Sequence, residues 1–202
     1  MLTTLLPPSS GTAHVAGFSI GSEAVGVRRV IGYVPQAVSV DGSLTGYENL
    51  LIFAKLYDLP RRERSARVAD ALAFMGLTDA AGRMVREYSG GMIRRLEIAQ
   101  STLHRPKFVF LDEPTGGLDP IARNAVWDHL TRLLKAGIRG VSEGAGDTPP
   151  RIAIHIDRGG DWATTKWFFD HLEAAHVPYD IIAESFYPPW RHGTLEKLQQ
   201  TM

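Results

Sequence analysis

The segment Tyr88–Gln100, which reads YSGGMIRRLEIAQ, has the residue types of a phosphate-binding turn. Gly90 and Gly91 carry no Cβ atom, so the backbone can approach a phosphate closely at these positions. A helix is predicted to begin directly afterwards, and the N-terminus of a helix favours an anion. The simpler alternative is a helix start that Ser89 caps and that binds no ligand.

Two carboxylates lie about twenty residues further along the chain. Asp112 and Glu113 directly follow Lys107–Leu111 (KFVFL), a continuous apolar run typical of a strand buried in a parallel sheet. The segment Gly117–Pro120 (GLDP) comes next, and an amphipathic helix is expected at Ile121–Leu134. Each motif is weak alone, but their order along the chain is specific.

The elements upstream of these motifs follow from apolar spacing and turn residues. A short strand and turn are expected at Thr12–Ile20, and a better strand at Val27–Val34 (VRRVIGYV), which ends at Pro35 and Gln36. Helical spacing then extends over Leu44–Ala81.

Two helices are predicted within this helical stretch. Thr45 has the position of an N-cap for the first, with Glu48 three residues later as in a capping box. The second begins in the basic run Arg61–Arg67, which is read as a solvated helix face, and stops near Gly76.

Together these motifs resemble those of the ATP-binding subunit of an ABC transporter, and Leu59–Gln100 is especially similar to the ATPases of drug and antibiotic-resistance exporters. The resemblance covers residues 1 to about 134. It implies an α/β fold, namely an incomplete P-loop NTPase core with a helical signature subdomain at about residues 44–102.

The resemblance also implies roles for the residues of the two central motifs. Ser89, Gly90 and Gly91 would reach the γ-phosphate of an ATP molecule held by the opposite subunit. Asp112 would hold Mg²⁺, usually through water. Glu113 would be the catalytic residue that orients and deprotonates the attacking water.

Two further positions match the nucleotide site of that family. Gln36 would contact the Mg²⁺ and the attacking water and sense the membrane partner, and Asp119 would lie in a loop that contacts the opposite subunit. The implied cofactors are ATP and Mg²⁺. The implied partners are a separate membrane-spanning permease subunit and either a second copy of this chain or a complete ATP-binding subunit. Such a protein would be cytoplasmic and peripheral to the inner face of the cell membrane.

The phosphate loop of that family, Gly-x-x-x-x-Gly-Lys-Ser/Thr, is missing, and the sequence contains no Gly-Lys dipeptide. Met1–Leu6 reads as the last turns of a helix whose start is absent, so the family resemblance predicts truncation just after the loop. Each charge-assisted hydrogen bond to a phosphate contributes ~1.5–3 kcal/mol. We therefore expect this polypeptide to hydrolyse ATP negligibly.

The last third of the sequence resembles a different family. After a junction at residues 135–150, residues 151–202 are similar to the arabinogalactan endo-1,4-β-galactanases, and strand 151–157, helix 162–175 and strand 179–184 would form part of a TIM barrel. That family's two catalytic carboxylates lie outside this window. The residues that would line a sugar site are His155, Tyr187, Trp190 and His192. His155 has a second reading, as a displaced γ-phosphate sensor.

The composition excludes several classes of protein. The 22 basic and 22 acidic residues among 202 balance to zero net charge, which does not favour a nucleic-acid partner. The absence of cysteine excludes disulfides and thiolate chemistry. No apolar stretch approaches the ~20 residues of a membrane span. The N-terminus has no basic start and breaks at Pro7-Pro8, so it is a poor signal peptide.

Three functions remain open on the sequence. The chain is an ATP-binding subunit of an ABC exporter, inactive in hydrolysis because the phosphate loop and the terminal histidine strand are absent. It is alternatively a galactan-degrading enzyme fragment, or a non-catalytic subunit that offers Ser89–Gly91 to an intact ATPase. A join of two unrelated gene fragments accounts for the change of family along the chain.

Overall fold

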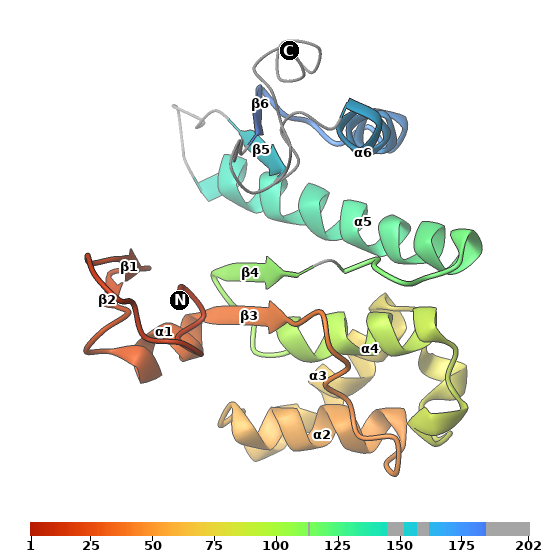
Figure 1. The fold of residues 1–202 in the computed structure, drawn as a ribbon. Helices are drawn as coiled ribbons and strands as arrows, with labels where there is room; N and C mark the ends of the chain where they lie inside the picture. Colours follow the sequence, from red (N-terminus) through yellow and green to blue (C-terminus); the bar gives the residue numbers. More distant parts are fainter. Residues whose placement is uncertain (113, 145–151, 157–161, 185–202) are drawn as a thin grey trace. The chain divides into compact units, whose positions relative to one another are not determined.

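The computed structural model of the chain describes residues 1–112, 114–144, 152–156 and 162–184 (Figure 1). The chain divides into two compact units, Met1–His129 and Leu130–Met202. Helices and parallel strands occur in both, so the predicted α/β class is confirmed.

The first unit begins with a hairpin and a short helix. Strands β1 (His14–Val15) and β2 (Phe18–Ser19) pair antiparallel around a turn, and helix α1 (Ala24–Val30) follows. Residues of these elements and of the next strand form a small apolar core, namely Val15, Ile20, Val27 and Ile31.

The strand predicted at Val27–Val34 is wrong in its first half. Val27–Val30 form the end of α1, and β3 comprises only Ile31–Val34. The adjacent charges Arg28 and Arg29 break the alternation that a strand requires. Val27 and Ile31 lie four residues apart in sequence and both pack into the same core, a spacing that suits a helix.

Strand β3 pairs in parallel with β4 (Phe108–Leu111), with Ile31 opposite Phe108 and Val34 opposite Leu111. The expectation that β4 is buried is wrong, since Phe108 is 49% exposed and Leu111 is 39% exposed. Within the described ranges β4 has a single strand neighbour, so much of its apolar surface lacks a covering element.

A group of helices packs beside this sheet. Its members are α2 (Gly46–Leu56), α3 (Arg61–Phe74), the 3-10 turns Thr78–Ala80 and Val85–Glu87, and α4 (Gly90–Thr102). The fully buried side chains Leu50, Val68, Leu77 and Leu96 come from these helices and the connection after α3, and they form the core between them. The predicted capping box of Thr45 and Glu48 is confirmed.

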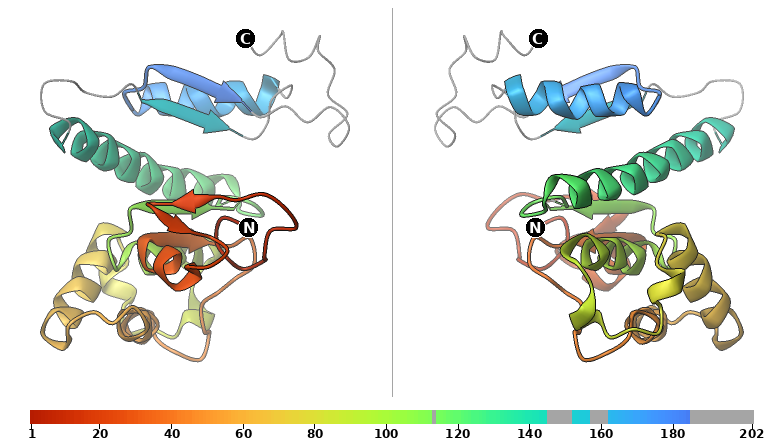
Figure 2. Two further views of the ribbon diagram at one scale, coloured as in Figure 1. Left: turned by 90° about the vertical axis from the view of Figure 1, so that its left-hand side faces the viewer. Right: turned by 90° about the vertical axis from the view of Figure 1, so that its right-hand side faces the viewer.

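Helix α5 (Pro120–Gly144) continues well beyond its expected end at Leu134. In the second unit, β5 (Ala153–Ile156), α6 (Trp162–Ala174) and β6 (Ile181–Glu184) form a βαβ arrangement with parallel strands. Helix α6 covers one face of the strand pair (Figure 2). The predicted order of strand, helix and strand is therefore confirmed.

Within the described ranges, no helix combines the length and hydrophobicity needed to span a lipid bilayer.

Candidate functional site

The Ser-Gly-Gly turn forms the start of α4, as predicted. Ser89 is the N-cap, and its Oγ accepts a hydrogen bond of 3.3 Å from the amide of Met92. Ser89 and Gly90 are exposed. Among the described residues, the amides of Gly90 and Gly91 donate no hydrogen bond. The cap and the anion-binding interpretation are compatible at Gly90, whose amide lies unbonded at an exposed helix N-terminus, whereas Gly91 is buried.

The absence of Cβ atoms in this turn also serves close packing. A Cβ added at Gly91 would lie 2.9 Å from Cβ of Ala122, and one at Gly90 would lie 3.3 Å from Cδ2 of Leu118. The start of α4 therefore contacts the loop around Leu118 and the first turn of α5. The fold brings together two motifs that are well separated in the sequence.

Asp119 lies in this loop and is exposed. Its Oδ1 accepts hydrogen bonds of 3.0 Å from the amides of Ile121 and Ala122. This carboxylate oxygen caps α5, so one function of Asp119 is to hold the loop against the start of its own helix.

Asp112 extends the parallel ladder beyond β4, since its amide donates to the carbonyl of Val34 at 3.0 Å. Its carboxylate is exposed and forms a hydrogen bond with the phenol of Tyr33. Burial raises the pKa of Tyr33, and the charge and hydrogen bond of Asp112 raise it further. The predicted catalytic residue Glu113 lies outside the described residues.

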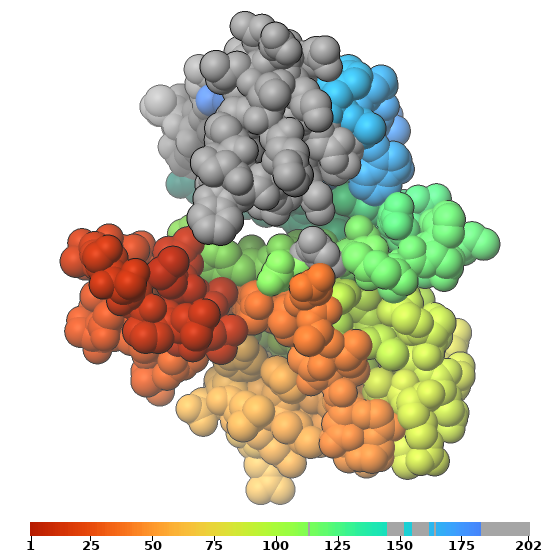
Figure 3. Space-filling model, viewed as in Figure 1, coloured from red at the N-terminus to blue at the C-terminus, as the bar shows by residue number. Residues whose placement is uncertain are grey.

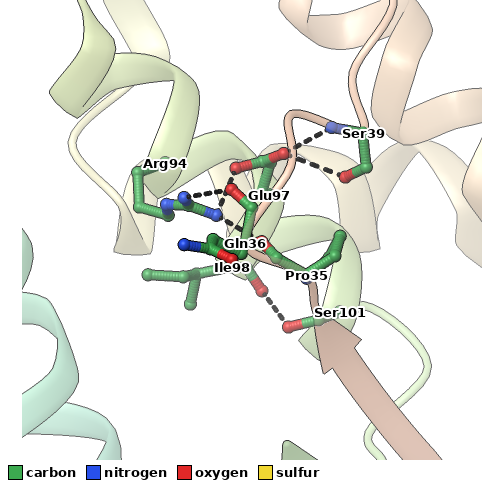
Figure 4. A network of polar contacts seen from close by, with 7 residues as sticks. All are labelled: Pro35, Gln36, Ser39, Arg94, Glu97, Ile98 and Ser101. Carbon is green, nitrogen blue, oxygen red and sulfur yellow. Dashed lines mark hydrogen bonds and ion pairs between the residues drawn. The ribbon is translucent and has the colours of Figure 1, made fainter. Parts of the chain in front are cut away.

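Gln36 follows the carboxyl end of β3, and its side chain is exposed. The segment that contains it, orange in Figure 3, runs along the surface of the first unit. The carbonyl oxygens of Pro35 and Gln36 accept hydrogen bonds from Nη1 and Nη2 of Arg94 in α4, at 2.7 and 3.1 Å (Figure 4). Gln36 is therefore attached to the helix that begins with the Ser-Gly-Gly turn.

The sequence analysis missed a buried ion pair at this attachment. Nη1 of Arg94 lies 2.9 Å from Oε2 of Glu97, and the two side chains are 7% and 1% exposed. Oε1 of Glu97 accepts hydrogen bonds from the amide and hydroxyl of Ser39, at 2.6 and 3.0 Å. The only signal in the sequence was an opposite charge pair at helical spacing, a pattern usually found on a solvated face.

The residues of the candidate site can supply ligand atoms for Mg²⁺ and ATP, the two cofactors that the family resemblance implies. Asp112 and Gln36 follow the carboxyl ends of neighbouring parallel strands, and carboxylate and amide oxygens are ligands that Mg²⁺ accepts. The start of α4 suits a phosphate. In the described part of the chain, no group of three or more acidic, histidine or cysteine side chains forms a complete metal site.

Of the four residues predicted to line a sugar site, only His155 lies among the described residues. His155 lies in β5, where its backbone is opposite Ala183 of β6. Tyr187, Trp190 and His192 lie outside the described residues. The sugar site therefore stays a prediction.

Two family models match the chain. The ABC transporter model matches residues 1–116, and the model of glycosyl hydrolase family 53 matches residues 100–202. The predicted resemblances of the first and last parts of the chain are thus confirmed, with an overlap at residues 100–116 that contains β4.

Relatives of known role match the first part. The daunorubicin/doxorubicin resistance ATP-binding protein DrrA of Streptomyces peucetius is 50% identical over 140 residues, which are 68% of this chain and 42% of that protein. The linearmycin resistance ATP-binding protein LnrL of Bacillus subtilis is 37% identical over 138 residues, 68% of this chain and 44% of that protein. The chain spans less than half the length of these relatives.

A solved structure supports the same comparison. The protein cbiO1 from Clostridium perfringens, described as part of the ABC transporter complex cbiONQ, matches with a TM-score of 0.58 and 28% identity. The match covers 65% of this chain and 54% of that chain.

Proposed function

Because the chain belongs to the ABC transporter family, we propose that residues 1 to about 134 act as an ATP-binding subunit of a drug or antibiotic-resistance exporter. The observation that carries the proposal is the exposed start of α4 at Ser89 and Gly90, where the amide of Gly90 donates no hydrogen bond among the described residues. The names of the relatives, which are resistance ATP-binding proteins, support this choice of exporter.

The roles proposed for individual residues are those that the family resemblance implies. Ser89, Gly90 and Gly91 bind the γ-phosphate of an ATP molecule held by an opposing subunit. Asp112 and Gln36 supply oxygens to the Mg²⁺ of the other nucleotide site of the pair, and Glu113 orients the attacking water there. The bound Mg²⁺ neutralises charge on the phosphates during transfer.

We further propose that this chain contributes the Ser-Gly-Gly half of a shared site and hydrolyses ATP negligibly alone. Its sequence contains no Gly-Lys dipeptide, so it lacks the lysine and backbone cradle of a phosphate loop. A complete ATP-binding subunit supplies that loop. The assembly works at the cytoplasmic face of the membrane, on a separate permease subunit.

The test uses DrrA of Streptomyces peucetius as the complete subunit, in a variant whose own signature serine is replaced by arginine. This variant retains a phosphate loop but cannot activate a second copy of itself. Addition of the present chain is expected to raise Mg²⁺-dependent ATP hydrolysis. The matched control, Ser89→Arg in the present chain, is expected to remove the increase, because a bulky cation blocks the turn.

Three results contradict the proposal. If the wild-type chain and Ser89→Arg have the same effect on hydrolysis, the start of α4 does not serve the partner's nucleotide. If the chain alone hydrolyses ATP with Mg²⁺, and Glu113→Gln abolishes this turnover, the inactive assignment is wrong. Tight binding of labelled ATP by the isolated chain also contradicts the inactive assignment.

A second candidate function rests on the match of residues 100–202 to glycosyl hydrolase family 53. The parallel β5–α6–β6 unit is compatible with part of a (β/α) barrel. Retaining glycosidases need two carboxylates about 5–5.5 Å apart, on different strands. Release of reducing sugar from galactan by the purified chain supports this candidate, and no release under conditions where an intact galactanase is active excludes it.

A further inference from the structure

We propose that Arg94 is a positioning residue for Gln36: it ties the backbone that carries this glutamine to the helix that begins with the Ser-Gly-Gly turn. The inference rests on the proposed function for the role of Gln36 in the Mg²⁺ site. The attachment itself is a property of the free chain and can be tested without nucleotide.

The guanidinium of Arg94 makes two hydrogen bonds to consecutive carbonyl groups. Nη1 donates to Pro35 at 2.7 Å and Nη2 donates to Gln36 at 3.1 Å. The guanidinium is planar and rigid, so two donors in a fixed fork specify the path of the backbone more tightly than one flexible donor does. Lysine has the same charge but lacks this fork.

Glu97 holds Arg94 in place and attaches the far end of the same segment. Its Oε2 lies 2.9 Å from Nη1 of Arg94, and its Oε1 accepts from the amide and hydroxyl of Ser39. The segment from Pro35 to Ser39 is therefore bound to α4 at both ends (Figure 4).

Apolar packing gives this segment little support. Residues 36–39 are all exposed, and the side chain with the largest apolar surface among them, Val38, is 64% exposed. Because burial of apolar side chains contributes little here, the hydrogen bonds to Arg94 and Glu97 contribute strongly to its position. Loss of these bonds is expected to release Gln36 while the rest of the fold remains.

The consequence concerns the first two turns of α4. Ser89 and Arg94 lie within the first two turns of one helix, so a ligand that shifts the Ser-Gly-Gly turn also shifts the point of attachment of Gln36. The ion pair thus links the γ-phosphate contact of one nucleotide site with the Mg²⁺-sensing glutamine of the other. Such a link is reciprocal, since coupling between two binding sites acts equally in both directions.

The test is amide hydrogen exchange of the full chain with Arg94→Lys. Exchange at Gln36–Ser39 is expected to accelerate at least about tenfold, because the fork to two carbonyl groups is lost. Exchange in α2 and α3 is expected to stay unchanged. The amide of Ser39 is the most direct reporter, because it donates to Glu97.

The matched control is Arg95→Lys, at the next position of the same helix. Nη1 of Arg95 donates to the carbonyl of Met75 at 3.0 Å, and its Nε donates to the carbonyl of Gly91 at 3.4 Å. Its hydrogen bonds among the described residues are therefore directed away from Pro35–Ser39. Exchange at Gln36–Ser39 is expected to match the wild type in this variant. Equal acceleration of exchange in Arg94→Lys and Arg95→Lys would mean that the effect is not specific to Arg94. That result overturns the proposal.

A second variant covers the case in which Arg94→Lys fails to fold. In the double variant Arg94→Met and Glu97→Leu, apolar side chains replace both buried charges, an exchange that proteins often tolerate. The melting temperature is expected to be retained while exchange at Gln36–Ser39 still accelerates. Retained protection of these amides in a folded double variant overturns the proposal.

A parallel measurement with the signature-deficient DrrA, ATP and Mg²⁺ separates this inference from the proposed function. Protection at Ser89–Gly91 reports the shared site. Its absence contradicts the proposed function, whereas the exchange of Gln36–Ser39 in the free variants still decides the role of Arg94. If protection at Ser89–Gly91 is transmitted to Gln36 equally in wild type and Arg94→Lys, the positioning role is wrong.

Discussion

Gly32 in β3 lies directly against the carbonyl oxygen of Ser101 in α4, with no room between them for a methyl group. A Cβ added at Gly32 would also lie 3.2 Å from Cγ of Pro106. The parallel strands and the helix of the Ser-Gly-Gly turn are thus held at a distance that only glycine permits.

Gly32→Ala is expected to lower the free energy of unfolding by about 2–3 kcal/mol, because the obstacle is backbone rather than a movable side chain. Urea denaturation followed by circular dichroism measures the loss. Gly82→Ala is the control, since a Cβ there meets no atom within 4 Å, and its effect is expected within about 0.5 kcal/mol of zero. Equal effects of the two substitutions contradict the packing argument.

The start of α2 gives a prediction about helix capping. Oγ1 of Thr45 accepts a hydrogen bond of 3.1 Å from the amide of Glu48, and Oε2 of Glu48 accepts one of 2.8 Å from the amide of Thr45. Thr45→Ala is expected to lower the free energy of unfolding by about 1 kcal/mol, whereas Thr45→Ser keeps the hydroxyl and most of the stability. A Thr45→Ser variant as unstable as Thr45→Ala would contradict the capping role.

The same capping box predicts a dependence on acid pH. The hydrogen bond from the Thr45 amide, followed by that from its hydroxyl, lowers the pKa of Glu48 from its ordinary value of 4.5. The stabilisation is therefore complete above pH 4.5 and is lost as the pH falls through the lowered pKa of the folded state. The difference in unfolding free energy between wild type and Glu48→Gln should shrink as the pH falls below 4.5 and through the lowered pKa. A difference that stays constant over this pH range contradicts the prediction.

His104 predicts a second dependence of the unfolding free energy on pH, closer to neutral pH. Its Nε2 lies 2.9 Å from the carbonyl oxygen of Ile31, its ring stacks on Tyr57 at 3.8 Å, and its buried Nδ1 has no partner among the described residues. Burial lowers the pKa of His104 from its ordinary value of 6.5, although the hydrogen bond to Ile31 acts in the opposite direction.

The direction of this pH dependence follows from whether the folded or the unfolded chain binds a proton at the higher pH. Below pH 6.5 the unfolded chain protonates His104 before the folded chain does, so the free energy of unfolding falls as the pH drops toward the lowered pKa. His104→Gln retains a donor for Ile31 but does not titrate. Urea denaturation at pH 7.5 and pH 5.5 should show a smaller loss of stability for this variant, and an unchanged loss would exclude His104 as the source.

The contact between α4 and α5 predicts a rescue. Gly91→Ala places a methyl group 2.9 Å from Cβ of Ala122 and is expected to lower the free energy of unfolding by about 1–2 kcal/mol. Removing the opposing methyl group with Ala122→Gly is expected to recover part of this loss. A double-mutant cycle measures the coupling directly, and strictly additive effects would show that the two positions do not touch.

Local hydrogen bonding explains why parts of the fold could be predicted. The caps at Thr45 and Ser89 involve partners three residues away, so the residue types are sufficient to identify them. The β5–α6–β6 order was likewise expected, from the resemblance of the last third of the chain to the galactanases. The order of the motifs also indicated the family, which the comparisons confirm.

Predictions failed where packing overrode the local pattern. The β-branched residues of Val27–Val30 favoured a strand, but the burial of Val27 in the core of the N-terminal elements occurs on a helix. The run Phe108–Leu111 was apolar enough for a buried strand, yet exposure depends on how many neighbours the strand has, which its own residues do not specify.

The sequence by itself determined the family, through the order of its motifs, and the two helix caps, because each cap depends on residues within a few positions of one another. Only the tertiary structure decided that Arg94 and Glu97 are buried and bound to the segment that carries Gln36. Those partners lie 58 and 59 positions away in the chain. Contacts across such separations arise only when β3 and α4 pack together, so a local pattern of charges cannot reveal them.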